Sequence, residues 1–304
     1  MRMVVALGGN ALLLRGQRPD ANVERATVDS AARTLSRVAA EHEVVLTYGN
    51  GPQVGVLASL YGEGGGPSPY PLDAVGAQTQ GMLAYWLVQS LKNEHPKREI
   101  VAVINQVIVD QADPAFDEPT KFVGRTYSPE EAGRLSAERG WQVKRDGAQW
   151  RRVVPSPLPR AVVEIEALRA LVEMGFMVVC GGGGGVPVIV TAEGRLHGVE
   201  AVVDKDLTSV VLAEELEAEL LVILTDVPHV YRDWNGAQSA PILRATPAEM
   251  LALPFPRGSM GPKVQAASSF VSRTRHAAVI GNVENLAETL DGRAGTWIVP
   301  APEE

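Results

Sequence analysis

Cysteine is almost absent from this 304-residue chain: the only one is Cys180, at the end of the apolar segment GFMVVC. A single cysteine cannot form a disulfide within the chain, and its apolar neighbours predict a small core residue rather than a reactive nucleophile. Long apolar runs are absent too, since no stretch approaches the roughly 18 residues that cross a bilayer. Met1-Arg2 leads into an apolar segment without a signal-peptide pattern, so we expect a cytoplasmic protein with no membrane segment.

Positive charge is scarce. The formal net charge is −8, which argues against nucleic acids and acidic membrane surfaces as partners. Only six of the 28 basic residues are lysines, and three of these stand in unusual contexts: Lys121 in PTKFVG, Lys205 in VDKDL and Lys263 in MGPKV. If the ligand is a polyanion, its site must gather such cations locally.

Several familiar catalytic patterns are also missing. None of the five histidines lies in a glycine-rich motif, so no histidine general base is visible. The sequence lacks zinc-type Cys/His spacing, the Gly-x-Ser-x-Gly nucleophile motif, a P-loop and a helix-opening GxGxxG. A reaction without a base fits better, because a carboxylate oxygen that attacks a phosphoryl group is already anionic.

The chain does contain an alternation of apolar runs and amphipathic patterns, which is typical of an α/β fold with a mainly parallel sheet. The predicted strands are 3–7, 43–47, 100–104, 176–180, 220–224, 277–280 and 296–299. Apolar residues at three- and four-residue spacing predict sheet-covering helices within 22–43, 71–93, 164–175, 206–219 and 262–273. Residues 113–159 break this rhythm and are too long for a plain loop, which predicts an inserted subdomain or lid.

Three glycine-bearing loops follow predicted strands, at 8–10, 49–51 and 181–185. Loops at the carboxyl ends of parallel strands form the ligand crevice of an open α/β sheet, and free N–H groups at a helix N-terminus bind anions. Taken alone, the second loop could be an ordinary strand-to-helix turn, and the five glycines of the third could be a flexible connector.

The lysine contexts leave similar alternatives open. Lys205 stands between Asp204 and Asp206 at the start of a predicted helix, where a surface ion-pair cluster would explain it equally well. Lys263 follows Pro262, the predicted first residue of another helix, where a cation opposes the helix dipole and therefore indicates a partner such as a phosphate. Lys121, taken alone, would be a solvated surface residue.

Motifs along nearly the whole chain carry a family resemblance: VALGGNALL, GNGPQVG, GAQTQGM, VDQADPAFDEPTK, RRVVPSPLP, VVCGGGGGVPV, GVEAVVDKDL, LVILTDVPHVY, GSMGPKV and GTWIVP. In these motifs and their order the chain resembles the carbamate kinases of the amino acid kinase family. The resemblance implies an open αβα sandwich with two lobes. Residues 1–200 would bind carbamate or carbamoyl phosphate, with a protruding subdomain at about 113–159, and residues 201–304 would bind the nucleotide.

The implied reaction is reversible phosphoryl transfer between ATP and carbamate, giving ADP and carbamoyl phosphate. Mg²⁺ would bridge the nucleotide phosphates, with no metal site made by the protein itself, and the chain would form a homodimer. The resemblance leaves the pathway open between arginine fermentation, purine or allantoin breakdown, and carbamoyl phosphate supply.

The resemblance also implies a specific role for each residue of the site. The resemblance implies a KxGG motif at the first strand of other amino acid kinases. Ala6 stands at the position of that lysine here. Lys121 of the inserted segment would therefore supply the missing positive charge. The implied catalytic residues are Lys121, Lys263, Lys205 and Asp206. The implied carbamate and phosphoryl contacts are Gly8, Gly9, Asn10, Gly49, Asn50 and Gly51. The implied nucleotide contacts are Gly182, Gly183, Lys205, Thr225, Asp226, Val227, Tyr231, Met260, Gly261 and Lys263.

Two positions depart from the family pattern. Tyr48 stands where THGNGPQVG is more usual, and Phe122 follows Lys121 where PTKP is usual. We expect neither to contact a residue with an implied role, although Phe122 could alter how the lid presents Lys121. Two other functions remain open: another acylphosphate-forming amino acid kinase, and a non-catalytic sensor of carbamoyl phosphate or nucleotide.

Overall fold

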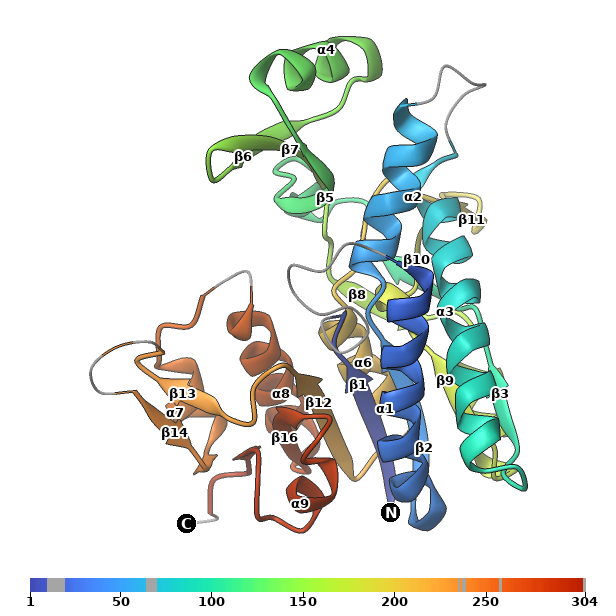
Figure 1. Cartoon of the computed structure of the whole chain (residues 1–304), viewed down its shortest axis with the longest axis vertical. Coiled ribbons are helices and arrows are strands. Elements are labelled where there is room, and N and C mark those ends of the chain that lie inside the picture. Colours follow the sequence, from blue (N-terminus) through green and yellow to red (C-terminus); the bar gives the residue numbers. More distant parts are fainter. Residues whose placement is uncertain (10–19, 64–69, 235, 237–238, 257–258, 303–304) are drawn as a thin grey trace.

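The computed structural model describes residues 1–9, 20–63, 70–234, 236, 239–256 and 259–302, and its centre is an eight-stranded sheet (Figure 1). In spatial order the strands are β15 (Arg244–Ala245), β17 (Thr296–Ile298), β16 (Ala277–Asn282), β12 (Leu220–Thr225), β1 (Arg2–Leu7), β2 (Glu43–Tyr48), β9 (Met177–Cys180) and β3 (Ile100–Ala102). Neighbouring strands run parallel except β16 and β17. The predicted α/β class and mainly parallel sheet are therefore confirmed.

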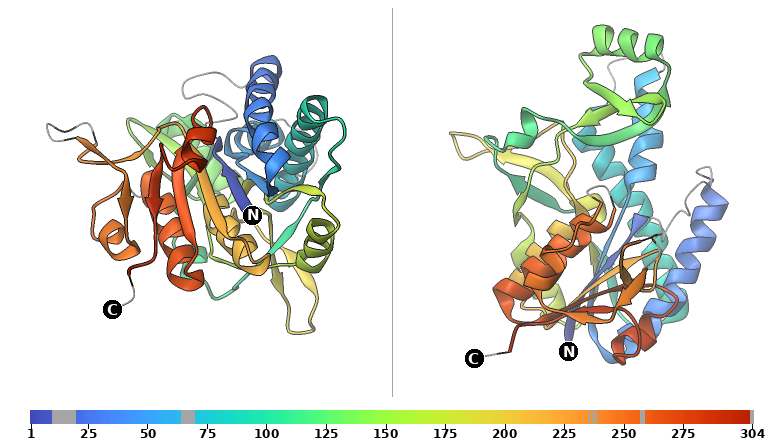
Figure 2. Two further views of the ribbon diagram at one scale, coloured as in Figure 1. Left: turned by 90° about the horizontal axis from the view of Figure 1, so that it is seen from below. Right: turned by 90° about the vertical axis from the view of Figure 1, so that its left-hand side faces the viewer.

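Helices cover both faces of this sheet, as the view from below shows (Figure 2). One face carries α1 (Ala21–Glu41), α3 (Leu72–Glu94) and the short α9 (Leu286–Leu290). The other carries α5 (Ile165–Glu173), α6 (Lys205–Glu215) and α8 (Met260–Thr274). Side chains alternate between the two faces along a strand. In β1, Val5 packs in the core beneath α1 and α3, and Val4 packs in the core beneath α5, α6 and α8. Both faces are buried, which explains why the predicted strands read as continuous apolar runs.

All the strands predicted from apolar runs are present in this sheet, but shorter strands were missed. A second sheet contains β11 (Leu196–Gly198), β10 (Val186–Val190), β4 (Gln106–Val109) and β8 (Pro159–Val162) in that order. A hairpin joins β13 (Val230–Arg232) to β14 (Ala240–Ile242). All of these strands except β10 have three or four residues, which give too few alternations to be recognised from sequence alone.

A small unit projects from one end of the molecule (Figure 1). It comprises β5 (Lys121–Tyr127), α4 (Pro129–Arg139), β6 (Val143–Asp146) and β7 (Gln149–Val154). Its three strands form a separate antiparallel sheet, and its own core contains Tyr127, Ala132 and Leu135. Helix α4 begins at a capping box, in which the Ser128 side chain accepts from the Glu131 N–H and the Glu131 side chain accepts from the Ser128 N–H.

The remaining helices are short or lie beside glycine loops. Helix α2 (Gly51–Glu63) begins directly at the second glycine loop, and α7 (Pro247–Leu251) begins after a capping box at Thr246. Single turns of 3₁₀ helix occur at Pro114–Phe116 and Gly182–Gly184. Within the described part of the chain, no helix combines the length and the apolar character required to cross a bilayer.

Candidate active site

A cleft of about 760 Å³ opens where the projecting unit faces the loops of the main sheet and the first turns of α6 and α8. The residues that line this cleft include several to which the family resemblance assigns a role: Gly9, Gly49, Asn50, Gly51, Lys121, Gly183, Lys205, Asp206 and Lys263. These residues come from the N-terminal loops, the projecting unit and two C-terminal helices. Folding therefore brings most of the residues predicted to bind the phosphoryl groups together in this cleft.

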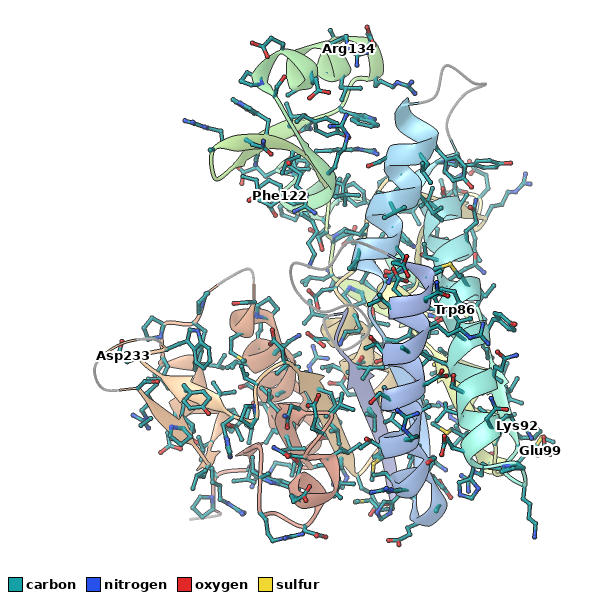
Figure 3. The ribbon with its side chains drawn as sticks, in the orientation of Figure 1. Trp86, Lys92, Glu99, Phe122, Arg134 and Asp233 are labelled. Atoms are coloured by element: carbon teal, nitrogen blue, oxygen red, sulfur yellow. The ribbon has the colours of Figure 1, made fainter. Side chains whose placement is uncertain are left out.

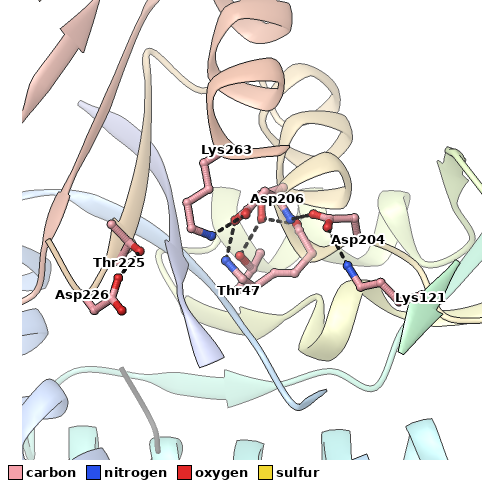
Figure 4. Close-up of polar contacts among 9 residues, drawn as sticks. Thr47, Lys121, Asp204, Asp206, Thr225, Asp226 and Lys263 are labelled. Atoms are coloured by element: carbon pink, nitrogen blue, oxygen red, sulfur yellow. Dashed lines mark hydrogen bonds and ion pairs between the residues drawn. The ribbon is translucent and has the colours of Figure 1, made fainter. Parts of the chain in front are cut away.

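The first turn of α6 presents one carboxylate to two lysines (Figure 4). Lys205 Nζ lies 2.5 Å from Asp206 Oδ1, and Lys263 Nζ lies 2.8 Å from Asp206 Oδ2. Asp206 and Lys205 are both buried. Asp204 is the N-cap of the helix, and its side chain accepts from the Asp206 N–H at 2.9 Å. Because α8 begins at Met260 rather than at the predicted Pro262, Lys263 lies at the end of its first turn.

Burial and charge compete within this cluster. Burial alone would raise the pKa of the Asp206 carboxyl, but the two ammonium groups outweigh burial and hold that pKa well below its ordinary value. Burial opposes the charge of Lys263 as well, yet the nearby Asp206 carboxylate leaves the pKa of Lys263 raised. For Lys205 burial dominates, and its pKa is lowered despite the same carboxylate. At neutral pH Asp206 is thus ionised and Lys263 protonated.

Lys121 reaches the same helix end from the projecting unit. Its Nζ lies 3.1 Å from Asp204 Oδ2, and its side chain is 46% exposed. At the first strand, Ala6 is fully buried in the core shared with α6 and α8. The cleft therefore contains a lysine that is carried by β5, a strand outside the main sheet.

The glycine loops are only partly free to bind a ligand. The Gly8 N–H donates to the Leu224 carbonyl and the Gly49 N–H donates to the Leu7 carbonyl, both at 3.0 Å. These bonds continue the pairing of the parallel strands and already occupy both N–H groups. Gly9 and Gly51 line the cleft, whereas Asn10 lies outside the described residues.

The third glycine loop is shaped by its neighbours. A Cβ atom at Gly182 would lie 2.6 Å from the Tyr48 hydroxyl oxygen, and Gly183 has a φ of +62° beside the Asn50 side chain. Tyr48 is fully buried and donates its hydroxyl hydrogen to the Gln80 carbonyl at 2.9 Å. Burial raises the pKa of Tyr48, which keeps the ring neutral. Contrary to expectation, Tyr48 therefore packs directly against the loop, and Gly182 is covered rather than exposed to the cleft.

Most of the implied nucleotide contacts lie elsewhere. Thr225, at the end of β12, donates to the Asp226 carboxylate at 3.1 Å (Figure 4). The Tyr231 and Trp234 rings are in contact at a tilt of 60°, with their centroids 5.1 Å apart. Six of the implied nucleotide contacts are not among the residues that line the cleft: Thr225, Asp226, Val227, Tyr231, Met260 and Gly261. Gly261 instead lines a separate cavity of about 680 Å³ between α7 and α8.

Phe122 and Arg151 are among the cleft residues that have no role in the sequence-based prediction. Phe122 lines the cleft beside Lys121, and Arg151 of β7 places its guanidinium 5.9 Å from the Phe122 ring centroid. Arg151 also donates from Nε to the Gly124 carbonyl at 2.7 Å. Phe122 therefore lies at the cleft, on the strand that also carries Lys121. The arginine pair in RRVVPSPLP was the available signal, but nothing in that motif shows which arginine faces the cleft.

The donor set does not resemble a metal centre made by the protein. Among the described residues, no group of three or more His, Cys, Asp and Glu side chains is placed to hold a metal ion. Both carboxylates of the cleft, Asp204 and Asp206, are already bound by lysines. The arrangement is suited to binding an anion and neutralising charge that moves between oxygens.

Similarity to known proteins extends over the whole chain. The model of the amino acid kinase family matches residues 1–282. A carbamate kinase of Rhizobium meliloti is 45% identical over 98% of this chain and 93% of its own length. A carbamate kinase of Haemophilus influenzae is 45% identical over 100% and 98%, respectively. The solved structure of a carbamate kinase from Giardia lamblia bound to AMP-PNP has a TM-score of 0.91 and 36% identity, covering 99% of this chain and 98% of that one. The chain therefore belongs to the amino acid kinase family, and within it to the carbamate kinases.

Proposed function

We propose that the protein transfers a phosphoryl group reversibly between ATP and carbamate, giving ADP and carbamoyl phosphate. One observation carries the proposal beyond family membership: Lys121, Lys205 and Lys263 converge on the end of α6, where two carboxylates hold them. Lysines gathered at one cleft suit transfer between two anions, because charge builds up on the transferred oxygens.

The proposed mechanism needs no general base, since the carbamate oxygen attacks as an anion. Lys121 and Lys263 would neutralise the transferred phosphoryl group from opposite sides, and Lys205 would contact the nucleotide phosphates. Asp206 would fix the two lysines that it binds, so that they do not reorganise during the transfer. Backbone N–H groups at Gly9 and Gly51 would complete the contacts on the carbamate side.

We assign the two substrates to different parts of the chain. Residues 1–200, with the projecting unit, would hold carbamate or carbamoyl phosphate, and residues 201–304 would hold the nucleotide through the segments at 225–231 and 260–263. The AMP-PNP in the Giardia lamblia structure supports a nucleotide as one substrate. Mg²⁺ would enter with the nucleotide, bridging its phosphates, as part of the substrate.

The site would select carbamate mainly by excluding larger acids. One missing methylene changes binding by only about 1–3 kcal/mol, so a site for so small an acid discriminates mainly by leaving no room for larger ones. The tight packing of Gly49 against Gly9 is consistent with this, since a Cβ atom at Gly49 would lie 2.7 Å from the Gly9 nitrogen.

We further propose a homodimer in the cytoplasm that forms ATP during catabolism, in arginine breakdown among other pathways. Light scattering tests the assembly, because a mass near the 32.4 kDa of one chain would contradict a dimer. Fractionation of the source cells tests the location.

The reaction itself is tested by ATP formation from ADP, Mg²⁺ and fresh carbamoyl phosphate, with acetyl phosphate as the control. We expect ATP with carbamoyl phosphate alone. ATP from acetyl phosphate at a similar rate would favour another acylphosphate-forming kinase. Failure with both donors, in a protein that still binds ADP, would favour a sensor.

A further inference from the structure

An ion pair at the base of the projecting unit has no part in the mechanism above. Arg152 of β7 donates from Nη2 to Glu200 Oε2 at 2.8 Å, and its side chain is only 14% exposed. The guanidinium also stacks on Trp141, 4.5 Å from the ring centroid. The arginine is thus held on two sides, within the unit by Trp141 and outside it by Glu200.

Glu200 joins this unit to the body of the protein. Its second oxygen, Oε1, accepts from the Leu72 N–H at 2.8 Å, at the first residue of α3. Pro71, the N-cap of that helix, offers no side-chain hydrogen bond, so Glu200 satisfies a donor that the local sequence leaves free. One carboxylate therefore connects the N-terminus of α3 to the projecting unit.

The same connection leads to the catalytic cluster. Glu200 lies four residues before Asp204, and the Val202 N–H between them donates to the Pro155 carbonyl at 3.0 Å, just after β7. In the β5–β7 pairing Val123 lies opposite Arg152 and Lys121 opposite Val154. The segment that carries Asp204 is thus hydrogen-bonded to Pro155, the residue that follows the partner of Lys121 in the β5–β7 pairing.

We propose that Arg152 and Glu200 are positioning residues, which hold β5 and β7 so that the Lys121 ammonium stands at the end of α6. The inference rests on the proposed function of Lys121. Glu200 is 53% exposed, and an ion pair of this kind contributes little to overall stability. Its effect is on geometry, and a displacement of about 1 Å in a catalytic group can cost on the order of 10²-fold in rate.

The test is a double-mutant cycle between Glu200→Gln and Lys121→Ala, measured as ATP formation from carbamoyl phosphate and ADP. Glu200→Gln keeps an oxygen for the Leu72 N–H and removes the charge that binds Arg152. We expect kcat to fall about tenfold in the otherwise unchanged protein, with the KM for ADP altered less than twofold. In the Lys121→Ala background the same change should cost less than twofold, because the group that it positions is gone. A tenfold loss in both backgrounds, or none in the first, overturns the inference.

Arg134→Ala is the matched control. Arg134 pairs with Glu138 on α4, at the far end of the same unit from Phe122 (Figure 3), and should leave kcat unchanged. Amide hydrogen exchange of residues 121–127 gives a readout independent of turnover, and Glu200→Gln should accelerate it while the central strands stay protected. If the unaltered protein makes no ATP, the proposed function fails, and unchanged exchange would then overturn the positioning role separately. Arg152→Gln, which removes the charge of the other partner, replaces Glu200→Gln should that variant not fold, with the same expected results in the cycle.

Discussion

The Lys121 ammonium lies 3.1 Å from the Asp204 carboxylate, although 83 positions separate the two residues in the sequence. This contact is where the projecting unit meets the end of α6. The Lys121 side chain is 46% exposed, and ion pairs at such exposure are worth about 1 kcal/mol or less. Lys121 can therefore exchange the carboxylate for a phosphoryl group at little cost.

Replacing Lys121 should impair turnover far more than nucleotide binding. Lys121→Ala removes a cation already in place for the transferred phosphoryl group, so kcat should fall on the order of 10²-fold or more. Calorimetric titration should show ADP binding retained, because the proposed nucleotide contacts lie in the C-terminal part of the chain. Near-normal turnover would remove our explanation of how the protein functions with Ala6 at the first strand.

Removing the carboxylate between the two lysines should destabilise the protein. Asp206→Asn leaves Lys205 and Lys263 without their shared partner in a buried setting, which we expect to cost about 3 kcal/mol or more at neutral pH. Urea denaturation at pH 7 measures the loss. Equal stability of the two proteins would show that solvent, rather than Asp206, compensates the lysines.

The same variant should reveal a pH dependence. The pKa of Asp206 is lowered in the folded protein, so its contribution is complete above the ordinary carboxyl pKa of about 3.9 and is lost as the pH falls below it. The difference in stability between the parent protein and Asp206→Asn should therefore shrink as the pH falls from about 4 to about 2. Denaturation curves across this range check the sign, and a difference that widened on acidification would contradict it.

The third glycine loop should not tolerate a side chain at the cleft. Gly183 has a φ of +62°, and a Cβ atom there would lie 1.9 Å from Asn50 Oδ1, so Gly183→Ala must displace Asn50. We expect kcat/KM for carbamoyl phosphate to fall about tenfold or more. Gly133→Ala is the control, because the same change on α4 meets nothing within 4 Å and should leave the rate unaltered.

The single cysteine should be inert in the folded protein. Cys180 is fully buried, and burial raises the pKa of its thiol to about 12, so almost no thiolate exists at pH 8. Ellman's reagent should detect no thiol in the native state and one per chain after denaturation. Rapid reaction of the native protein would show that the strand end at Cys180 opens.

The central strands could be predicted because each depends on local pattern. Segments such as 3–7 and 220–224 are continuous apolar runs, and strands buried on both faces need nothing else to be recognised. The five consecutive glycines at 181–185 likewise indicated an unusual backbone conformation, and four of them have a positive φ in the structure. Local context singled out Lys121, Lys205 and Lys263 and indicated a phosphate partner for Lys263, whereas their specific roles came from the family resemblance.

Other features depended on which parts of the chain meet. Nothing near Gly8 or Gly49 in the sequence shows that their N–H groups are used by Leu224 and Leu7, because that follows from the order of strands in the sheet. The link between Arg152 and Glu200 is equally invisible, since 48 positions separate them. The sequence by itself determined the elements and the kinds of charge available, because backbone preference and burial pattern are local properties. Only the tertiary structure decided which N–H groups stay free and which lysine stands opposite which carboxylate, because those contacts arise when distant segments pack together.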